Sequence, residues 1–396
     1  MSRSTYLIVG GGMTAAAAVR GIREIDTTGT ITVIGADIDP PYRRPWLSKQ
    51  LWKGKELEKV FLKAEFPGTT FLTSRTVVAI DANAISATDD QGVVHTGEKM
   101  LIATGAMPRT LPGSFDNVIA YRSLDDYRHL RTLADQGLTF AVVGGGFVGS
   151  EIAAALRMQG NDVSMLFPGA TIGDRVFPAD LGESLNAMFR AKGIDVRTGE
   201  SVLGVTEHGG QLRVAVSGGD RATLDVGAVV VGIGVVPNVD LAKDAGIKVD
   251  NGIEVDKYLQ TSAPKIYAAG DVAKVWQDEL GEWRRVEHED NANAMGKHAG
   301  KTMAGQATPW DYLPMFYSDL FDVGYEAVGV IDAHLDVVED WSTPMQTGVI
   351  YYLHDDKVRG VLAMNVWDQV DRARDLITSG KRFSILSATE RIPNGN

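Results

Sequence analysis

One glycine-rich loop occurs twice in this sequence, each time between a predicted strand and a predicted helix. The first copy, residues 10–15, follows the apolar run 6–9 and precedes an alanine-rich helix that is predicted to reach residue 25. The second copy, residues 144–149, follows the apolar run 140–143 and precedes a helix predicted over 150–159. Such a loop lets backbone N–H groups approach a pyrophosphate at the positive end of the helix. Two copies in one chain predict two doubly wound nucleotide-binding domains.

Particular positions in each loop have particular tasks. Gly10 permits the tight turn, Gly12 permits close approach of the phosphates, and Ala15 takes the small position where helix meets strand. The second copy supplies the matching candidates Gly144, Gly146, Phe147, Val148 and Gly149. Two glycine-rich turns without ligands are the alternative. The strand–loop–helix context of both copies favours dinucleotide binding.

The strand that follows each helix ends where an acidic residue usually meets the adenosine ribose. After the strand predicted over 30–34, Ala36 holds that place and Asp37 follows, so Asp37 is the candidate. A surface aspartate that begins a turn is the alternative. The strand predicted over 162–167 ends in Phe-Pro-Gly, with Gly169 at the decisive place. Because no cluster of arginines is present to bind a 2′-phosphate, we predict NAD as the dinucleotide. NADP is the alternative.

Three further segments follow a recognisable order along the chain. Residues 261–271 read TSAPKIYAAGD, in which a strand ends at Gly270 and sets the Asp271 carboxylate beside a helix N-terminus, where it can bind the ribityl chain of a flavin. The ATG segment consists of Ala103, Thr104 and Gly105, and residues 231–238 read VGIGVVPN. Each alone is also typical of a buried strand and turn. Their order predicts two crossings of the chain between nucleotide domains.

Composition excludes several classes of function. The chain of 396 residues contains no cysteine, which excludes disulfides, thiolate metal sites and a redox dithiol. The net charge of −12 argues against nucleic acid as a partner. No apolar run is long enough to span a membrane, and the strand at 6–9 leaves no room for a targeting peptide. We therefore expect a cytoplasmic protein with no metal site.

The order of glycine loop, ATG, glycine loop, GxxPN and AGD resembles the flavoprotein family built like glutathione reductase. In the disulfide-reducing members of this family, the equivalent of residues 41–52 carries a cysteine pair. Here these residues read PYRRPWLSKQLW, which is similar to the PYxRPxLSK segment of the ferredoxin-reductase and apoptosis-inducing-factor branch. Residues 284–288, 315–320, 322–327 and 348–368 look most like apoptosis-inducing factor. The resemblance implies an FAD-dependent enzyme that passes hydride from NAD(P)H to flavin N5 and delivers the electrons without a redox cysteine.

The resemblance also implies a role for each matching position. Arg44, Lys49 and Arg122 would contact FAD, and Lys49 would pair with Glu151 beside flavin N5. Phe147 and Glu151 would cover the nicotinamide. The other positions of the dinucleotide site are Gly234, Glu287, His288, Tyr317 (where that factor has tryptophan), Glu326 and Asn365. The alternatives are a solvated helix charge for Lys49, a helix N-terminal acid for Glu151 and a surface histidine for His288.

The predicted architecture is α/β, with two doubly wound Rossmann-like domains and a C-terminal α+β domain. We expect an FAD-binding domain in two parts, 1–117 and 248–309, an NAD(P)H-binding domain at 118–247 and an interface domain at 310–396. One alternative function is an NAD(P)H:ferredoxin reductase component of an oxygenase system, with Arg43, Arg44, Arg284 and Arg285 as a local basic patch for the carrier. Another is a redox-sensing binding protein that forms a homodimer when NADH binds.

Overall fold

The computed structural model describes residues 2–63, 66–113, 115–218 and 222–395. The chain forms two compact units, each assembled from segments that are separated in the sequence. Unit 1 comprises Met1–Arg44, Lys55–Met107 and Val236–Pro314. Unit 2 comprises Pro45–Gly54, Pro108–Val235 and Met315–Asn396. Each unit contains one of the two glycine loops.

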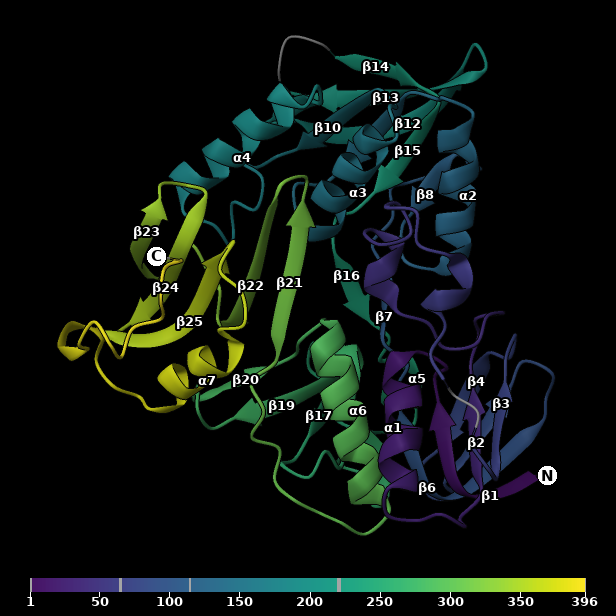
Figure 1. Ribbon diagram of the computed structural model, residues 1–396. Coiled ribbons are helices and arrows are strands. Elements are labelled where there is room, and N and C mark those ends of the chain that lie inside the picture. Colours follow the sequence, from purple (N-terminus) through teal and green to yellow (C-terminus); the bar gives the residue numbers. More distant parts are fainter. Residues whose placement is uncertain (1, 64–65, 114, 219–221, 396) are drawn as a thin grey trace. The chain divides into compact units, whose positions relative to one another are not determined.

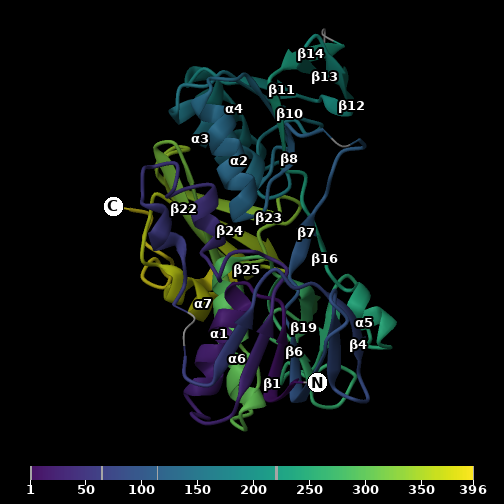
Figure 2. The same ribbon diagram turned by 90° about the vertical axis from the view of Figure 1, so that its right-hand side faces the viewer.

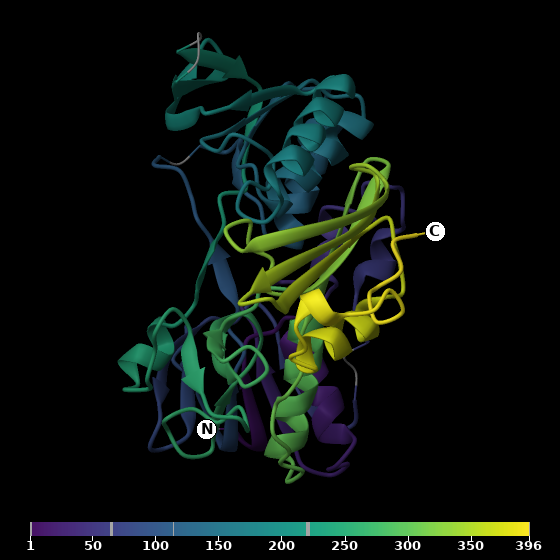
Figure 3. The ribbon, with the colours of Figure 1, turned by 90° about the vertical axis from the view of Figure 1, so that its left-hand side faces the viewer.

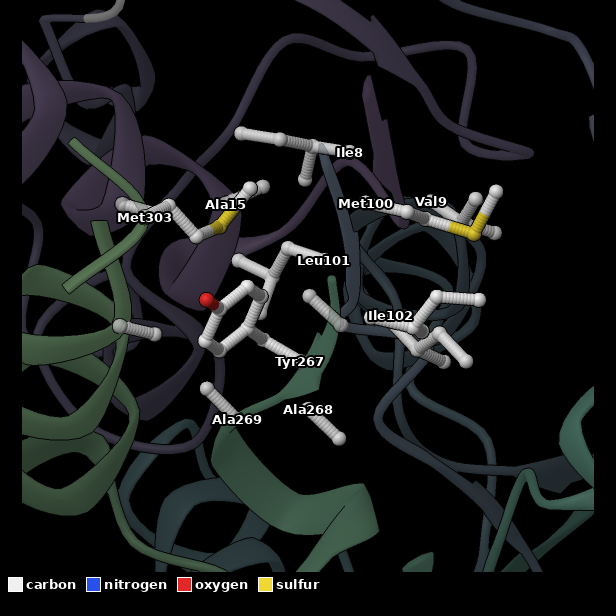
Figure 4. Close-up of a cluster of buried hydrophobic side chains, with 14 of the residues drawn as sticks. Ile8, Val9, Ala15, Met100, Leu101, Ile102, Tyr267, Ala268, Ala269 and Met303 are labelled. Atoms are coloured by element: carbon white, nitrogen blue, oxygen red, sulfur yellow. The ribbon is translucent and has the colours of Figure 1, made fainter. Parts of the chain in front are cut away.

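The main sheet of unit 1 has seven strands in the order β3-β2-β1-β6-β5-β4, with β18 paired to β6. Strands β1, β2, β3, β6 and β18 run parallel, whereas β4 and β5 pair antiparallel. Apolar runs such as Leu7-Ile8-Val9 are buried on both faces, as expected of central parallel strands. Figure 4 shows side chains of β1, β6 and β18 packed together in this core. The strands are β1 (Ser2–Val9), β2 (Ile31–Ile34), β3 (Thr69–Leu72), β4 (Val77–Asp81), β5 (Ser86–Asp89), β6 (Val94–Ile102) and β18 (Ile266–Ala268).

Two helices of unit 1, α1 (Met13–Arg23) and α6 (Glu289–Met303), pack with their backbones in close approach (Figure 1). A Cβ at Gly300 would collide with the carbonyl oxygen of Ala18, and one at Gly296 with that of Thr14. Small residues are therefore required at this crossing, which explains the alanine-rich sequence of α1. The remaining elements of unit 1 are η2 (Leu57–Val60), α5 (Asp240–Asp244), η3 (Gly270–Val272) and the three-stranded sheet of β17 (Ile253–Val255), β19 (Ala273–Gln277) and β20 (Glu282–Arg284).

Unit 2 contains a second parallel sheet, in the order β11-β10-β9-β15-β8. Its first three strands repeat the 3-2-1 order of unit 1, which is the doubly wound arrangement. Figure 2 shows the antiparallel sheet β12-β13-β14 that extends this part of the chain. The elements are β8 (Val118–Ala120), α2 (Leu124–Asp135), β9 (Phe140–Val143), α3 (Phe147–Met158), β10 (Val163–Phe167), α4 (Ala179–Ala191), β11 (Asp195–Thr198), β12 (Ser201–His208), β13 (Gln211–Ser217), β14 (Thr223–Val226) and β15 (Ala228–Val231).

The C-terminal segment of unit 2 forms a five-stranded antiparallel sheet in the order β21-β22-β25-β24-β23, and α7 packs against β22 and β25 (Figure 3). Tyr351 and Tyr352 are fully buried in β24. Most of the stretch 348–368 that resembles apoptosis-inducing factor lies in β24 and β25. The elements are β21 (Met315–Leu320), β22 (Val323–Gly329), β23 (Asp336–Thr343), β24 (Thr347–His354), β25 (Lys357–Met364), α7 (Val370–Thr378) and η4 (Phe383–Ile385).

The predicted class, two doubly wound sheets with an additional α+β part, is confirmed. Two helix boundaries differ from the prediction, because α1 ends at Arg23 rather than at residue 25 and α3 begins at Phe147 rather than near Ser150. The early start of α3 is due to Gly146, whose extended backbone caps the helix directly after the loop. The segment 41–52 forms only the short 3₁₀ helix η1 (Arg44–Leu47) and turns, where two prolines interrupt regular structure. The chain passes between the units at β7 (Ala106–Pro108) and β16 (Val235–Pro237), which pair with each other.

Candidate active site

The first glycine of each loop is a position that only glycine can occupy. Gly10 has φ of +114° and Gly144 has φ of +123°, a region that side chains disfavour. A Cβ at Gly10 would also collide with the carbonyl oxygen of Ala103, and one at Gly144 with that of Gly232. In both units, therefore, the glycine turn packs directly on the end of the neighbouring strand.

The third glycine of each loop caps a helix whose first turn is open. Gly12 precedes α1 and Gly146 precedes α3, and neither helix has a side-chain hydrogen bond at its cap. A Cβ at either glycine would have no heavy atom within 4 Å. First-turn N–H groups next to open space are what the pyrophosphate of a dinucleotide requires. Both loops fit such a group, and the small position after each loop is packed tightly, with Ala15 fully buried and Gly149 against the Gly144 carbonyl.

Unit 1 brings three of the predicted FAD contacts to the start of α1. A Cβ at Gly270 would collide with the side chain of Thr14, so the Ala-Gly-Asp segment lies against the first turn of this helix. The Arg44 backbone N–H lies 3.4 Å from Sδ of Met13, and the Arg44 guanidinium lies 5.2 Å from the Tyr42 ring centre. Asp271 follows Gly270 and is partly exposed. The loop, Arg44 and Asp271 thus gather at one helix N-terminus.

Asp37 lies shortly after the end of β2, beyond Gly35 and Ala36, and its carboxylate makes local hydrogen bonds. It accepts hydrogen bonds from the Tyr42 hydroxyl at 2.7 Å and from the Asp39 backbone N–H at 3.3 Å. The second bond belongs to a turn that begins at Asp37, as in the alternative reading of this residue. Binding of a ribose by Asp37 remains a prediction.

The ATG and PN segments are joined by reciprocal hydrogen bonds. Thr104 Oγ1 donates to the Asn238 carbonyl at 2.9 Å, and Asn238 Nδ2 donates to the Thr104 carbonyl at 2.8 Å. The Gly105 carbonyl accepts from the Asn238 backbone N–H at 3.0 Å. Gly234 has φ of +93° with open space where a Cβ would stand. The two crossing segments are therefore held together by hydrogen bonds, which their order in the sequence did not predict.

The structure brings Lys49 and Glu151 together within unit 2. Lys49 Nζ lies 2.6 Å from Glu151 Oε1, and the two residues are only 6% and 5% exposed. The alternative of a solvated charge for Lys49 is therefore wrong. Glu151 lies on α3, the helix that begins at the second glycine loop. The carboxylate of the pair therefore belongs to the helix whose N-terminus is open for a dinucleotide.

Two serines that the sequence reasoning missed complete the surroundings of this carboxylate. Ser48 Oγ donates to Glu151 Oε2 at 2.5 Å, and Ser318 Oγ donates to Oε1 at 2.6 Å. The Lys49 ammonium also lies 5.2 Å from the centre of the Tyr317 ring. Burial and the charge of Glu151 raise the pKa of the neighbouring Tyr325 well above its usual range. Both serines lie in stretches that carry the family resemblance, residues 41–52 and 315–320, but nothing in those stretches predicts their contact with Glu151.

Other candidates in unit 2 lie on the C-terminal sheet and on α3. The Phe147 ring lies 5.2 Å from that of Phe316 on β21. Glu326 on β22 lies opposite Tyr317 in the neighbouring strand β21. Burial raises the pKa of the Glu326 carboxyl. Asn365 Oδ1 accepts from the Gly324 backbone N–H at 2.9 Å, so this side chain already supports the sheet.

The remaining candidates are divided between the two units. In unit 1, Glu287 pairs with Arg285 at 2.5 Å, and His288 is the N-cap residue of α6. Arg284 pairs with Glu282 at 2.8 Å, which neutralises part of the predicted basic patch. In unit 2, Arg122 follows β8 and its backbone N–H donates to Asp126 at 2.9 Å. Contacts of these residues with a cofactor remain predictions.

Comparisons with known proteins agree with this geometry. A family model described as pyridine nucleotide-disulphide oxidoreductase matches residues 4–296, and one described as apoptosis-inducing factor, mitochondrion-associated, C-term matches 299–347. Apoptosis-inducing factor 1, mitochondrial, of Dictyostelium discoideum is 32% identical over 96% of this chain and 80% of its own. The anthranilate 1,2-dioxygenase system ferredoxin–NAD(+) reductase component of Burkholderia cepacia is 32% identical over 96% and 95%.

Solved structures agree as well. A chain of the covalent putidaredoxin reductase–putidaredoxin complex superposes with a TM-score of 0.89 at 27% identity, covering 96% of this chain and 94% of that chain. Among the helices of the described residues, none is long and apolar enough to cross a membrane. The chain therefore belongs to the pyridine nucleotide-disulphide oxidoreductase family, in the branch of apoptosis-inducing factors and ferredoxin reductases, and is an FAD-dependent NAD(P)H oxidoreductase.

Proposed function

We propose that this oxidoreductase takes hydride from NADH at the Lys49–Glu151 pair and passes the electrons, without a thiol, to a small one-electron carrier of the ferredoxin class. The observation that carries the proposal is the pair itself, a buried contact of 2.6 Å in a chain that has no cysteine. When bound, FAD supplies an acceptor for hydride and a donor of single electrons. The protein supplies position, charge and exclusion of water.

The residues around the pair have distinct tasks in this proposal. Glu151 fixes the Lys49 ammonium, whose positive charge favours the negative charge that accumulates on reduction. Phe147 and Tyr317 present aromatic surface that covers the nicotinamide and keeps water out. The open first turn of α3 binds the pyrophosphate of NADH. All these groups belong to unit 2.

The other predicted contacts divide by unit in the same proposal. The unit 1 group that would hold FAD consists of Gly10, Gly12, Ala15, Asp37, Arg44, Ala103, Thr104, Gly105, Gly270 and Asp271. The unit 2 group that would hold the nicotinamide dinucleotide adds Gly144, Gly146, Val148, Gly149, Gly234, Glu326 and Asn365. The cofactor contacts implied by the family resemblance are also proposed for Lys49, Arg122, Glu287 and His288. We also keep the predicted domain boundaries after residues 117, 247 and 309 and a cytoplasmic location.

The proposed acceptor rests on the relatives. The Burkholderia cepacia protein is named as a ferredoxin–NAD(+) reductase component, and the alignment covers 95% of it. The net charge of −12 repels an acidic carrier, so the carrier has to dock on a local basic surface. The test is reduction of cytochrome c by NADH with and without added ferredoxins. Strong dependence on a ferredoxin supports the proposal, and equal rates without one contradict it.

A second candidate function is a redox-sensing binding protein that dimerises when NADH binds. The match of residues 299–347 to the C-terminal family model of apoptosis-inducing factor favours it. Size-exclusion chromatography of the flavoprotein with and without NADH separates the two functions. A dimer that forms only with NADH, together with slow turnover, supports the sensor. A monomer that turns over quickly contradicts it.

A further inference from the structure

The strand β10 ends without the acidic residue that usually binds the adenosine ribose of the nicotinamide dinucleotide. In doubly wound domains an aspartate or glutamate about 20 residues beyond the glycine loop accepts the ribose 2′-hydroxyl. Here β10 ends at Phe167, and Gly169 stands at that place. On this basis the sequence distinguishes NADH poorly from NADPH.

The structure fills this place with a carboxylate from farther along the chain. A Cβ on Gly169 would collide with Asp174 Oδ2, so the Asp174 carboxylate lies directly over the glycine. Any side chain at residue 169 would displace it. Gly169 therefore has a role of its own: it lacks the usual carboxylate, and its lack of a side chain leaves room for the carboxylate of Asp174.

The loop that carries Asp174 is anchored to the dinucleotide loop. The Gly173 backbone N–H donates to the Gly145 carbonyl at 2.8 Å, which places Asp174 next to the glycine loop before α3. Asn186 on α4 braces the same loop, since it accepts from the Ile172 N–H at 3.0 Å and donates to the Ala170 carbonyl at 3.0 Å. The position of Asp174 is therefore set by contacts within unit 2.

The Asp174 carboxylate is itself available to a ligand. The side chain is exposed, and within the described part of the chain it makes no hydrogen bond or ion pair. An ionised carboxylate accepts hydrogen bonds from ribose hydroxyls and repels a 2′-phosphate. Arg175 follows it and is also exposed, so a cation that could attract a 2′-phosphate lies next in sequence.

We infer that Asp174 is the residue that selects NADH over NADPH, taking the place of the acid that is missing at residue 169. The inference rests on the proposed binding of the nicotinamide dinucleotide by unit 2, and it adds the determinant of which dinucleotide is used. Asp174 acts on binding of the adenosine end, so its loss changes KM much more than kcat. Gly169 is a positioning residue, since it acts through Asp174.

The test compares kcat/KM for NADH and NADPH in the FAD-loaded enzyme, with ferricyanide as acceptor. Wild type should prefer NADH. Asp174→Ser should lower the NADH/NADPH ratio about tenfold to a hundredfold, through a higher KM for NADH, because a hydrogen bond to a charged group is lost. Gly169→Ala should shift the ratio in the same direction, although it removes no polar atom. The control Glu207→Gln, an exposed acid on β12, removes one negative charge elsewhere and should leave the ratio unchanged.

A relocation variant guards against general damage to the loop. Asp174→Ser combined with Gly169→Glu puts the acid at the usual place and should restore much of the NADH preference, which a merely unfolded loop would not do. An unchanged ratio in Asp174→Ser, a wild type that prefers NADPH, or a shift in Arg175→Ser without one in Asp174→Ser would each overturn the inference. Wild-type enzyme that oxidises neither dinucleotide would instead contradict the proposed function.

Discussion

The Lys49 ammonium lies 2.6 Å from the Glu151 carboxylate, although 102 residues separate the two in the sequence. Both side chains are buried, and Ser48 and Ser318 donate to the same carboxylate. A buried charge that is paired and hydrogen-bonded is tolerated, whereas an unpaired one is strongly destabilising. The pair therefore couples the stability of unit 2 to the group on which the proposed chemistry depends.

Lys49→Met should destabilise the protein more than replacement of both partners does. The single variant leaves a buried carboxylate without its cation, at a cost of about 3–5 kcal/mol. Lys49→Met with Glu151→Gln leaves no charge and should recover part of that loss. Denaturant unfolding measures both. Lys53→Met is the matched control, because its contact with Asp319 at 3.1 Å is more exposed and should contribute at most about 1 kcal/mol. If the single and double variants lost the same free energy of unfolding, the unpaired Glu151 charge would not be the cause of the loss.

The two open glycines should affect different cofactors. Gly12→Ala adds a methyl group where the structure has room, so the fold should tolerate it, but the methyl occupies the approach to α1. We expect purified Gly12→Ala to contain less flavin per chain. Gly146→Ala should keep its flavin and raise the KM for NADH about tenfold, equivalent to ~1.4 kcal/mol. Flavin absorbance and steady-state kinetics measure the two effects. Loss of flavin from Gly146→Ala alone would reverse the assignment of the loops.

The crossing of α1 and α6 should reject any larger residue. Gly300→Ala places a Cβ against the Ala18 carbonyl, and the two helices have to separate. We expect a loss of about 1–3 kcal/mol, as is usual for overpacked cores. Lys297→Ala on the same helix removes only an exposed ion pair with Glu24 and should cost at most about 1 kcal/mol. Thermal unfolding of both variants makes the comparison, and a neutral Gly300→Ala would show that the crossing is looser than described.

Asp26 should stabilise unit 1 at neutral pH and lose this effect in acid. Hydrogen bonds from the backbone N–H groups of Gly29 and Thr28 hold the pKa of its carboxyl well below the usual range, and the Tyr6 hydroxyl donates to it at 2.9 Å. Because the folded-state pKa is lowered, the stabilisation is present above the unfolded pKa of about 4 and disappears as the pH falls through the folded value.

Asp26→Asn should therefore be less stable than wild type by about 1–2 kcal/mol at neutral pH. The difference should shrink as the pH falls below about 4. Unfolding midpoints of the two proteins over this range give the comparison. A difference that does not change with pH would mean that the charge of Asp26 contributes nothing.

Local sequence patterns predicted much of the fold because the glycine loops depend on local geometry. Gly10 and Gly144 adopt positive φ and pack on the neighbouring strand, and these requirements leave a direct trace in the sequence. The pattern placed the start of α3 too late, because it did not recognise Gly146 as a helix cap. The fold class could be predicted because the strand–glycine loop–helix pattern occurs twice along the chain.

Side chains that act through tertiary contacts left little or no local trace. The Lys49–Glu151 contact was predicted from a family resemblance, since no periodicity links residues so far apart. Ser318 reaches Glu151 only when β21 and α3 pack together. Asp174 lies beyond the end of β10 and returns over Gly169 because its loop is anchored to the glycine loop. Such residues can be assigned only once the packing is known.

The most direct test of the account is anaerobic reduction of the purified flavoprotein by NADH, followed by stopped-flow absorbance. We predict rapid bleaching of the flavin in wild type and slower bleaching in Lys49→Met, by about tenfold or more, equivalent to at least ~1.4 kcal/mol of transition-state stabilisation. Both proteins should contain flavin at the start. Bleaching of Lys49→Met at the wild-type rate, or no bleaching of wild type by NADH, would contradict the claim that hydride transfer depends on the Lys49–Glu151 pair.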